Sequence, residues 1–343
     1  MTPETALVEL ENAWRSCRRD PGFVRELRRH FAQHAGRPTP LTRADRLADR
    51  LGGGLRLYLK REDLTTTGTA GITVCLGHAL LARHLGKSRL VAGAGAGRHG
   101  VEAASAAAAL GLRCVVYVGR GSTRETDLVR MRQFGAEVVP AAARAAAIED
   151  ADLEAERDWA ASLGDTYLLP ASYAGDHPYP AIERDFEGVI GHEARVQVLE
   201  CEGRMPDALV ACVGRGSGAM GLFQAFLDDR EVLLFGVEAE EAGSVADAPE
   251  GAPAAPRPRS GVPERVRSMA VADAEALAAV QLLAATEGIL PGPFAARAVA
   301  HVARQGRGGG LGQVVLVGIS DRSDEMIDGA ESLARPAGLE AGR

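Results

Sequence analysis

The sequence predicts an α/β fold in which helices cover both faces of mainly parallel sheets. Short runs of apolar, often β-branched residues alternate with longer runs of helical periodicity along most of the chain, and this alternation is typical of parallel strands joined by crossover helices. The chain has 343 residues, of which 46% are hydrophobic, so it can bury large cores, and its length favours roughly two domains. We therefore expect two three-layer α/β domains.

The first expected helix begins next to Thr2, because Thr is a good N-cap and Pro3 suits the first helical position. A second helix is expected over roughly Phe23–His34, before the break at Gly36. The expected strands are Leu55–Lys60, Leu90–Ala92, Cys114–Val118, Glu137–Val139, Leu209–Val213, Val232–Val237 and Val314–Ile319. The expected helices are Leu76–Leu85, Val101–Leu110, Asp127–Phe134, Asp150–Leu163, Tyr179–Ile190, Ala219–Leu227, Asp273–Glu287 and Phe294–Arg304.

The composition argues against several classes of partner. The formal net charge is −7, so we expect neither nucleic acid nor an anionic membrane as a partner. The sequence has no apolar stretch long enough to cross a bilayer and its N-terminus lacks a signal-peptide pattern, so we expect a cytoplasmic protein. Five cysteines lie apart, with no CxxC pair or Cys/His cluster, and predict free thiols and no metal site. They are Cys17, Cys75, Cys114, Cys201 and Cys212.

Seven segments, in order and at similar spacing, resemble the β subunit of tryptophan synthase, a fold type II enzyme dependent on pyridoxal phosphate (PLP). They are Ala35–Leu41 (AGRPTPL), Leu57–Leu64 (LYLKREDL), Leu76–Leu81 (LGHALL), Arg98–Gly100 (RHG), Arg130–Pro140 (RMRQFGAEVVP), His177–Pro180 (HPYP) and Gly214–Gly221 (GRGSGAMG). The resemblance implies two α/β domains around a central cleft. The N-terminal domain would comprise residues 1–36 and 70–190, and the C-terminal domain residues 37–69 and 191–343.

One segment interrupts the alternation of strands and helices. Residues 246–263 contain five prolines and no aromatic residue, which is typical of a surface loop. The resembling family carries a much longer insert here, which helps to bind a monovalent cation and closes over the active site. The resemblance therefore implies that the cation site and part of the closing machinery are missing from this chain.

Three positions depart from the family's catalytic pattern. Gly71 stands where the family has the lysine that forms the Schiff base with PLP, Gly93 stands at a catalytic glutamate, and Phe294 replaces an acidic residue. The chain has two lysines, Lys60 and Lys87, so the other 37 of its 39 basic residues are arginines. We expect Lys60 to form a structural ion pair with Glu62 or Asp63 beside it, and Lys87 to lie at an exposed helix end. Because an aldimine requires a primary amine, we expect no cofactor; non-covalent PLP binding at Gly214–Gly218 is a weaker alternative.

Two glycine-rich loops, each between a strand and a helix, can present backbone amides to an anion or can simply form tight turns. In the family the first grips the substrate carboxylate and the second the PLP phosphate, and a serine equivalent to Ser320 meets the pyridine nitrogen. The candidate catalytic residues are Arg98, His99, Arg215 and Asp321. The candidate anion-binding residues are Gly95, Ala96, Gly97, Gly100, Gly214, Gly216, Ser217, Gly218 and Ser320. Arg215 either binds an anion or plugs the pocket, and His78, Cys75 and His177 are weaker candidates.

Two functions from different classes remain open. One is a PLP-independent biosynthetic enzyme that performs a bond-forming, cyclisation or lyase-type step on a small, apolar or indole-like acid. The other is a catalytically inactive pseudo-subunit that scaffolds or activates a partner enzyme. Because the resembling family forms hetero-oligomers whose β subunits pair, we expect a homodimer or a hetero-oligomer in either case.

Overall fold

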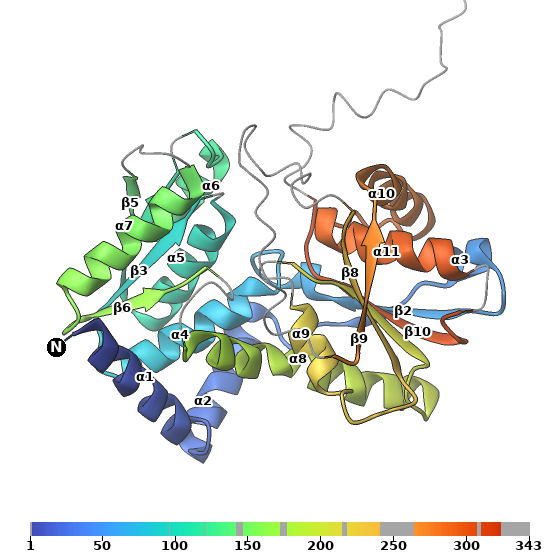
Figure 1. Ribbon diagram of the computed structural model, residues 1–343, viewed down its shortest axis with the longest axis horizontal. Helices are drawn as coiled ribbons and strands as arrows, with labels where there is room; N and C mark the ends of the chain where they lie inside the picture. The colour runs from blue at the N-terminus through green and yellow to red at the C-terminus, as the bar shows by residue number, and fades with distance from the viewer. Residues whose placement is uncertain are drawn as a thin grey trace, which may run out of the picture.

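The structure is a computed structural model of the full chain, and it describes residues 2–95, 97–119, 121–141, 147–171, 177–214, 218–240, 264–306 and 310–323. Its described strands form two separate sheets that lie side by side along the longest axis (Figure 1). The loop predicted at 246–263 lies outside the described residues. Among the described helices, none is long and apolar enough to cross a membrane.

The larger sheet has six strands. Neighbouring strands in it run parallel to each other, except that β1 is antiparallel to β2. In spatial order the strands are β1 (Leu41–Arg43), β2 (Arg56–Arg61), β10 (Val314–Ile319), β7 (Ala208–Cys212), β8 (Leu233–Ala239) and β9 (Val266–Val271). Alternate residues of β2 enter different cores, because successive side chains of a strand point to opposite faces. Leu57 and Leu59 belong to one core and Tyr58 to the other, so both faces of this sheet are covered.

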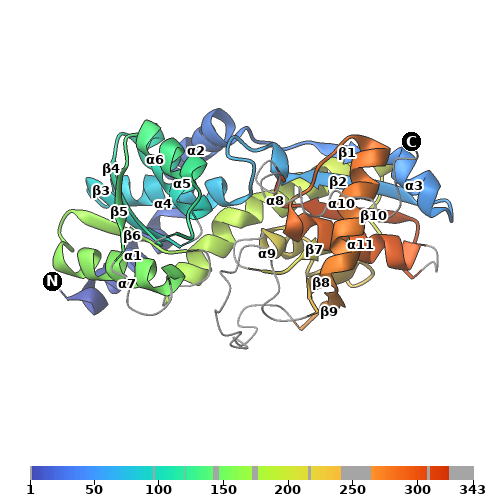
Figure 2. The ribbon, with the colours of Figure 1, turned by 90° about the horizontal axis from the view of Figure 1, so that it is seen from above.

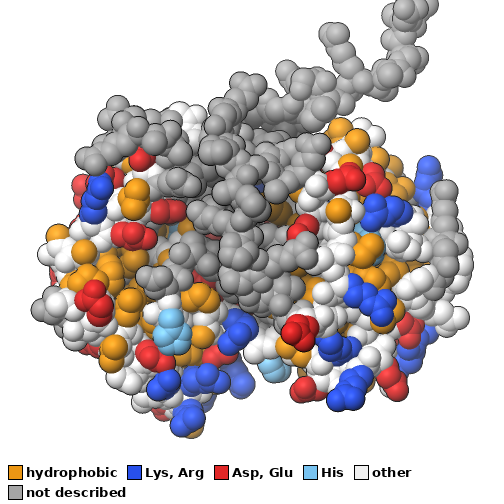
Figure 3. Space-filling view, in the orientation of Figure 1, with side chains coloured by type: hydrophobic (Ala, Val, Ile, Leu, Met, Phe, Trp, Pro, Cys, Tyr) orange, Lys and Arg blue, Asp and Glu red, His pale blue; other side chains and the backbone are white. Residues whose placement is uncertain are grey.

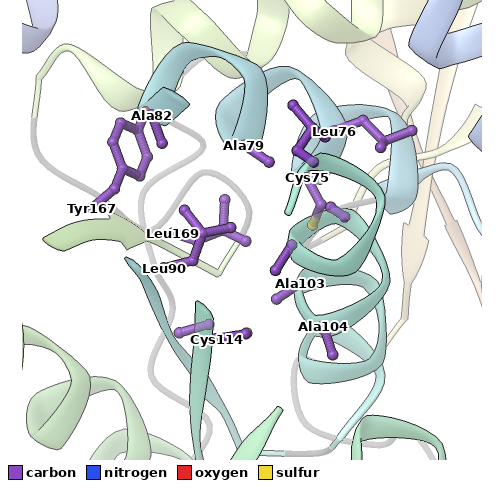
Figure 4. Close-up of a cluster of buried hydrophobic side chains, with 14 of the residues drawn as sticks. Cys75, Leu76, Ala79, Ala82, Leu90, Ala103, Ala104, Cys114, Tyr167 and Leu169 are labelled. Carbon is purple, nitrogen blue, oxygen red and sulfur yellow. The ribbon is translucent and has the colours of Figure 1, made fainter. Parts of the chain in front are cut away.

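The smaller sheet has four parallel strands. In spatial order they are β5 (Glu137–Pro140), β4 (Arg113–Val118), β3 (Arg89–Ala94) and β6 (Thr166–Leu169). Helices α5 (Arg98–Leu110) and α7 (Ala147–Ala161) both pack on β3, and they lie on opposite sides of the sheet (Figure 2). A close-up of the core beside this sheet shows small and apolar side chains of α4 (Gly71–His84), α5 and the strands in contact (Figure 4).

The remaining helices complete the layers and join the two halves. They are α1 (Pro3–Cys17), α2 (Pro21–His30), α3 (Asp45–Leu51), α6 (Glu125–Gln133), α8 (Tyr179–Glu202), α9 (Ala219–Gln224), α10 (Asp273–Glu287) and α11 (Pro293–Gly306). Helix α8 is continuous and contributes to the cores of both sheets, because Phe186 packs in the core of the smaller sheet while Ile190 and Val198 pack beside the larger one. On the face in Figure 3, acidic and basic side chains are interspersed over both halves.

Most of the predicted elements are present. Most ends shift by a few residues, but α4 begins at Gly71 rather than Leu76, and α8 continues to Glu202 rather than ending at Ile190. The α/β class is confirmed, and the strand Val314–Ile319 and the helix Asp273–Glu287 have the predicted bounds. Thr2 caps α1 by accepting a hydrogen bond from the amide of Thr5. The strands β1, β6 and β9 and the helix α3 were not predicted, since each is short or lacks a clear apolar alternation.

Candidate functional site

Gly71 is the first residue of α4 and faces a carboxylate from the neighbouring helix. A Cβ atom at this position would overlap the carboxylate of Glu102 on α5, with Oε1 at 2.6 Å and Cδ at 2.7 Å. The α4 N-terminus has no side-chain cap, and a carboxylate is favourable at the positive end of a helix dipole. Glu102 therefore fills the space next to residue 71 and also stabilises the start of α4.

One hydroxyl group holds Glu102 in this place, and a histidine ring lies close to it. The hydroxyl of Thr69 donates a short hydrogen bond to Glu102 Oε1, and His99 Nδ1 lies 3.9 Å from Glu102 Oε2. His99 and Glu102 are three residues apart and lie on the same face of α5. Sequence reasoning did not identify Glu102 or Thr69, because neither occupies a motif position of the resembling family.

The space beside Gly93, in β3, is occupied by a residue of the helix α7. A Cβ atom there would lie 2.7 Å from the Cα and 2.8 Å from the backbone nitrogen of Asp152, on α7. The close approach of α7 to the strand thus requires a residue without a side chain at position 93. A glutamate at this position would need the helix to move.

Arg98 and Asp321 form an ion pair between the two halves of the protein. Arg98 opens α5 beside the smaller sheet, and Asp321 follows β10 of the larger sheet. Arg98 Nη1 lies 3.5 Å from Asp321 Oδ2, and the side chains are 26% and 3% exposed. Two residues that the sequence singled out separately are therefore brought together.

The Asp321 carboxyl is buried and held from its own side of the site. Its Oδ1 accepts hydrogen bonds from the Ala295 amide at 2.9 Å and from the Ser320 hydroxyl at 3.2 Å. Burial raises the pKa of Asp321, against the opposing effects of Arg98 and these hydrogen bonds. The carboxyl also packs against Gly292, where a Cβ atom would overlap it.

The candidate anion loops are described only in part. Arg215, Gly216 and Ser217 of the second loop and Ala96 of the first lie outside the described residues. The ring of Phe294 packs against Gly214, with Cε1 3.1 Å from the position of an added Cβ atom. An apolar ring thus borders the second loop, where the family has an acidic residue in the resembling segment.

The described part of the first loop forms a tight turn. Gly97 has a φ of 96°, a conformation that favours glycine, and its amide donates to the Ala94 carbonyl at 3.2 Å. The Gly95 carbonyl accepts from the Ser122 hydroxyl at 2.6 Å. A Cβ atom at Gly100 would lie 2.7 Å from Val116 Cγ1. Gly97 and Gly100 thus have a clear structural role, and their anion-binding role stays a prediction.

Neither lysine of the chain lies beside Gly71. Lys60 is buried and donates to Glu193 Oε2 at 2.7 Å and to the Thr39 carbonyl at 2.8 Å. It makes the expected structural ion pair, but with Glu193 rather than with Glu62 or Asp63. Burial lowers the pKa of Lys60, and Glu193 opposes this effect.

The prediction for Lys87 is wrong in its surroundings. Its side chain is 7% exposed and pairs with Glu9 at 3.3 Å, and its ammonium donates to the Leu163 carbonyl at 3.0 Å. Packing of α1 and of the segment after α7 buries this helix end, which its local sequence did not reveal.

The weaker histidine candidates have structural surroundings. His177 is 71% exposed and forms a surface pair with Glu11. His78 is fully buried, with Nδ1 2.7 Å from the Tyr167 hydroxyl, and burial lowers its pKa to about 3. His99 lies in the first turn of α5, with 16% of its side chain exposed.

The family comparison places the chain among PLP enzymes. The family described as "Pyridoxal-phosphate dependent enzyme" matches residues 32–321. The chain belongs to this family. Among curated proteins, it is 38% identical over 361 residues to the tryptophan synthase beta chain of Afipia carboxidovorans, covering 94% of this chain and 89% of the relative. It is 39% identical over 362 residues to the tryptophan synthase beta chain of Methylobacterium sp., with the same coverage.

A solved structure supports the same assignment. The crystal structure of a threonine deaminase from T.th. is similar with a TM-score of 0.67 and 26% identity, covering 87% of this chain and 96% of the other. The resemblance to the tryptophan synthase β subunit and the fold type II architecture are thus both confirmed.

The expectation that the protein has no cofactor is wrong. The family is one of PLP-dependent enzymes, and the chain is related to its members over nearly its whole length. The expectation rested on a single position. A lysine supplies the covalent link, whereas loop amides and other side chains hold the phosphate and the ring of such a cofactor, so the residue at position 71 does not decide binding.

The described residues fit PLP in some respects and not in others. Gly218 opens α9 with a φ of 66°, which suits a turn that directs amides at a phosphate, and Ser320 is buried at the end of β10. Gly71 supplies no amine, and the Glu102 carboxylate fills the space beside it. We therefore assign PLP no reaction step.

Proposed function

We propose that this protein is a tryptophan synthase β-like enzyme that has been repurposed for a small carboxylate-bearing compound, with Arg98 as the anion contact and Asp321 as the proton donor and acceptor. The observation that carries this proposal is the Arg98–Asp321 pair at 3.5 Å, which joins the two halves of the protein. A guanidinium that remains partly exposed can exchange a protein carboxylate for a ligand carboxylate.

The pair also supplies a way to couple ligand binding to proton transfer. Burial raises the pKa of Asp321, while Arg98 lowers it. A ligand carboxylate that binds Arg98 screens the positive charge of the guanidinium from Asp321. The pKa of Asp321 then rises, so this carboxyl takes up a proton more readily. A buried carboxylic acid is then available to protonate the bound compound.

The reaction class that suits these groups is a bond-forming, cyclisation or lyase-type step. Positioning by Arg98 and proton transfer by Asp321 are sufficient in kind for such steps. The Phe294 ring beside Gly214 favours an apolar or indole-like compound. We do not assign the synthesis of tryptophan itself, because position 71 has no amine and position 93 no carboxylate. The single change Gly71→Lys is expected to leave tryptophan formation from indole and serine at background.

The test uses the full chain and two probes, indole-3-acetate and PLP, in calorimetric titrations. Arg98→Met is expected to weaken binding of indole-3-acetate at least tenfold. Arg113→Met is the matched control, because Arg113 forms an exposed pair with Asp165. Equal affinity of the wild type and Arg98→Met, or no binding of the carboxylate by the wild type, would overturn the proposal. The PLP titration reports the family's cofactor separately.

The alternative function is that of a pseudo-subunit which scaffolds or activates another enzyme. It is supported by the backbone of Asp152 lying where a side chain at residue 93 would stand, and by relatives that are named as one chain of tryptophan synthase. In this case we expect a complex with another biosynthetic enzyme, whose activity falls when this chain is removed. Native mass spectrometry of the freshly purified protein distinguishes the two functions. A retained small carboxylate favours the enzyme, whereas an empty homodimer or a co-purified second subunit favours the partner.

A further inference from the structure

Three side chains that can bind a metal converge beside Gly71. Among the described residues, Cys75 on α4 and His99 and Glu102 on α5 place one ligand atom each within 4.8 Å of one another. Cys75 Sγ lies 4.0 Å from His99 Nδ1, and the same Nδ1 lies 3.9 Å from Glu102 Oε2. Figure 4 shows Cys75 on the side of α4 that faces α5.

The orientation of His99 distinguishes a metal site from a catalytic relay. His99 Nε2 lies 3.4 Å from the Leu169 carbonyl, and a carbonyl oxygen only accepts, so Nε2 carries the hydrogen and Nδ1 the lone pair. In a relay, the thiol and the acid contact opposite nitrogens of the imidazole. Here both face Nδ1, as ligands that share one ion do.

We propose that Cys75, His99 and Glu102 bind one divalent transition-metal ion of the zinc type, with a fourth position open on the His99 side. Sulfur, imidazole and carboxylate together favour Zn²⁺ or Co²⁺ over Mg²⁺ or Ca²⁺. With metal–ligand distances of about 2.0–2.3 Å, tetrahedral ligand atoms are roughly 3.5 Å apart. The observed separations of 4.0 and 3.9 Å need only a small contraction.

Two of the three proposed ligands are also oriented by hydrogen bonds to other residues. Metal-binding histidines usually donate their other N–H to a carbonyl or carboxylate, and ligating carboxylates are themselves hydrogen-bonded. His99 has the Leu169 carbonyl in this role, and Glu102 has the Thr69 hydroxyl. The Cys75 side chain is buried, whereas 16% of His99 and 7% of Glu102 side-chain surface is exposed. The histidine edge is therefore the side open to a water molecule or another ligand.

This site goes beyond the proposed function, since neither Arg98 nor Asp321 supplies a ligand. The test uses the full chain, freed of metal with a chelator and then titrated with Co²⁺ and Zn²⁺ alone. We expect one Co²⁺ per chain, with the strong visible bands of tetrahedral coordination and a thiolate charge-transfer band, and displacement by Zn²⁺. Cys75→Ser is expected to remove the charge-transfer band and to weaken Co²⁺ binding at least tenfold.

The matched control is Cys17→Ser, because Cys17 is buried in the core of the same domain away from the cluster. It is expected to bind Co²⁺ as the wild type does. If Cys75→Ser does not fold, His99→Asn is the second variant, and it should weaken binding to a similar extent. A wild type that binds no stoichiometric metal, or binds it without a thiolate band, would overturn the proposal, as would equal binding by the Cys75 and Cys17 variants.

Discussion

This chain departs from the family that it resembles at Gly71 and Gly93, and different kinds of atom occupy the space beside these two glycines. At Gly71 the space is taken by the end of a flexible side chain, the Glu102 carboxylate. At Gly93 it is taken by the Asp152 carboxylate and also by the backbone of Asp152 on α7. A side-chain end can rotate away at modest cost, whereas a helix backbone moves only with everything packed on it. Position 71 is therefore open to change, and position 93 is closed by the fold.

This contrast bears on how the site is built. Around Gly71, polar groups from α4, α5 and the preceding turn have been assembled into a cluster that can take a ligand. Around Gly93, closer helix packing has replaced a polar position with a core contact. We propose that the polar cluster between α4 and α5 takes a ligand, whereas the packing of α7 on β3 at Gly93 is structural.

The largest effect is expected at the closed position. Gly93→Ala places a Cβ atom against the Asp152 backbone, and overpacking of this kind costs about 1–3 kcal/mol or more of the free energy of unfolding. Urea denaturation measures this loss. Gly164→Ala is the control, since an added Cβ atom there has no neighbour within 4 Å and is expected to change stability by less than about 0.5 kcal/mol. Equal stability of Gly93→Ala and Gly164→Ala would show that α7 does not exclude a side chain at position 93.

A smaller effect is expected at the open position. Gly71→Ala meets a carboxylate that can adopt another rotamer, so the expected loss is about 1 kcal/mol. The same denaturation experiment gives the order of the two glycine variants. A loss at Gly71 greater than that at Gly93 would show that the Glu102 side chain is as fixed as the α7 backbone.

The ion pair between Arg98 and Asp321 is expected to make the free energy of unfolding depend on pH. Burial raises the pKa of Asp321 above its unfolded value of 3.8, so its protonated form is favoured by folding. The stability that this carboxyl contributes is present at low pH and is lost as pH rises through the folded pKa. Arg98→Met raises that pKa further. It is therefore expected to cost about 1–2 kcal/mol at pH 7 and little at pH 4. Equal losses at both pH values in urea denaturation would contradict this coupling.

The sequence predicted the fold more completely than the site. The helix Asp273–Glu287 and the buried strand Val314–Ile319 were predicted with their observed bounds. Acidic residues in the first turn and Gly288 after the last turn indicate the ends of the helix, and an unbroken apolar run indicates the strand. The short strands β1 and β6 take their form from pairing with neighbouring strands, which local sequence does not encode. The domain boundary at residue 190 falls within the continuous helix α8 and stays a proposal.

The sequence predicted the site residues that lie in motifs shared with the family, and it did not predict site residues outside those motifs. Arg98 and Asp321 were singled out, but their pairing across the two sheets depends on tertiary structure. Cys75, His99 and Glu102 come from two helices, so no spacing along the chain indicates their cluster. The expectation of no cofactor was wrong because it rested on the missing lysine alone, whereas the relationship to PLP-dependent enzymes extends over residues 32–321.

The central claim is that Glu102 and residue 71 share one space, and a double-mutant cycle tests it most directly. The free energies of unfolding of the wild type, Gly71→Ala, Glu102→Ala and the double variant are measured in a chelating buffer, so that no bound metal contributes. Because Glu102→Ala empties the space that the new methyl group needs, we expect the double variant to be more stable than additivity predicts, by at least about 0.5 kcal/mol. Additivity within about 0.3 kcal/mol would contradict the claim, because it would mean that the two side chains do not meet.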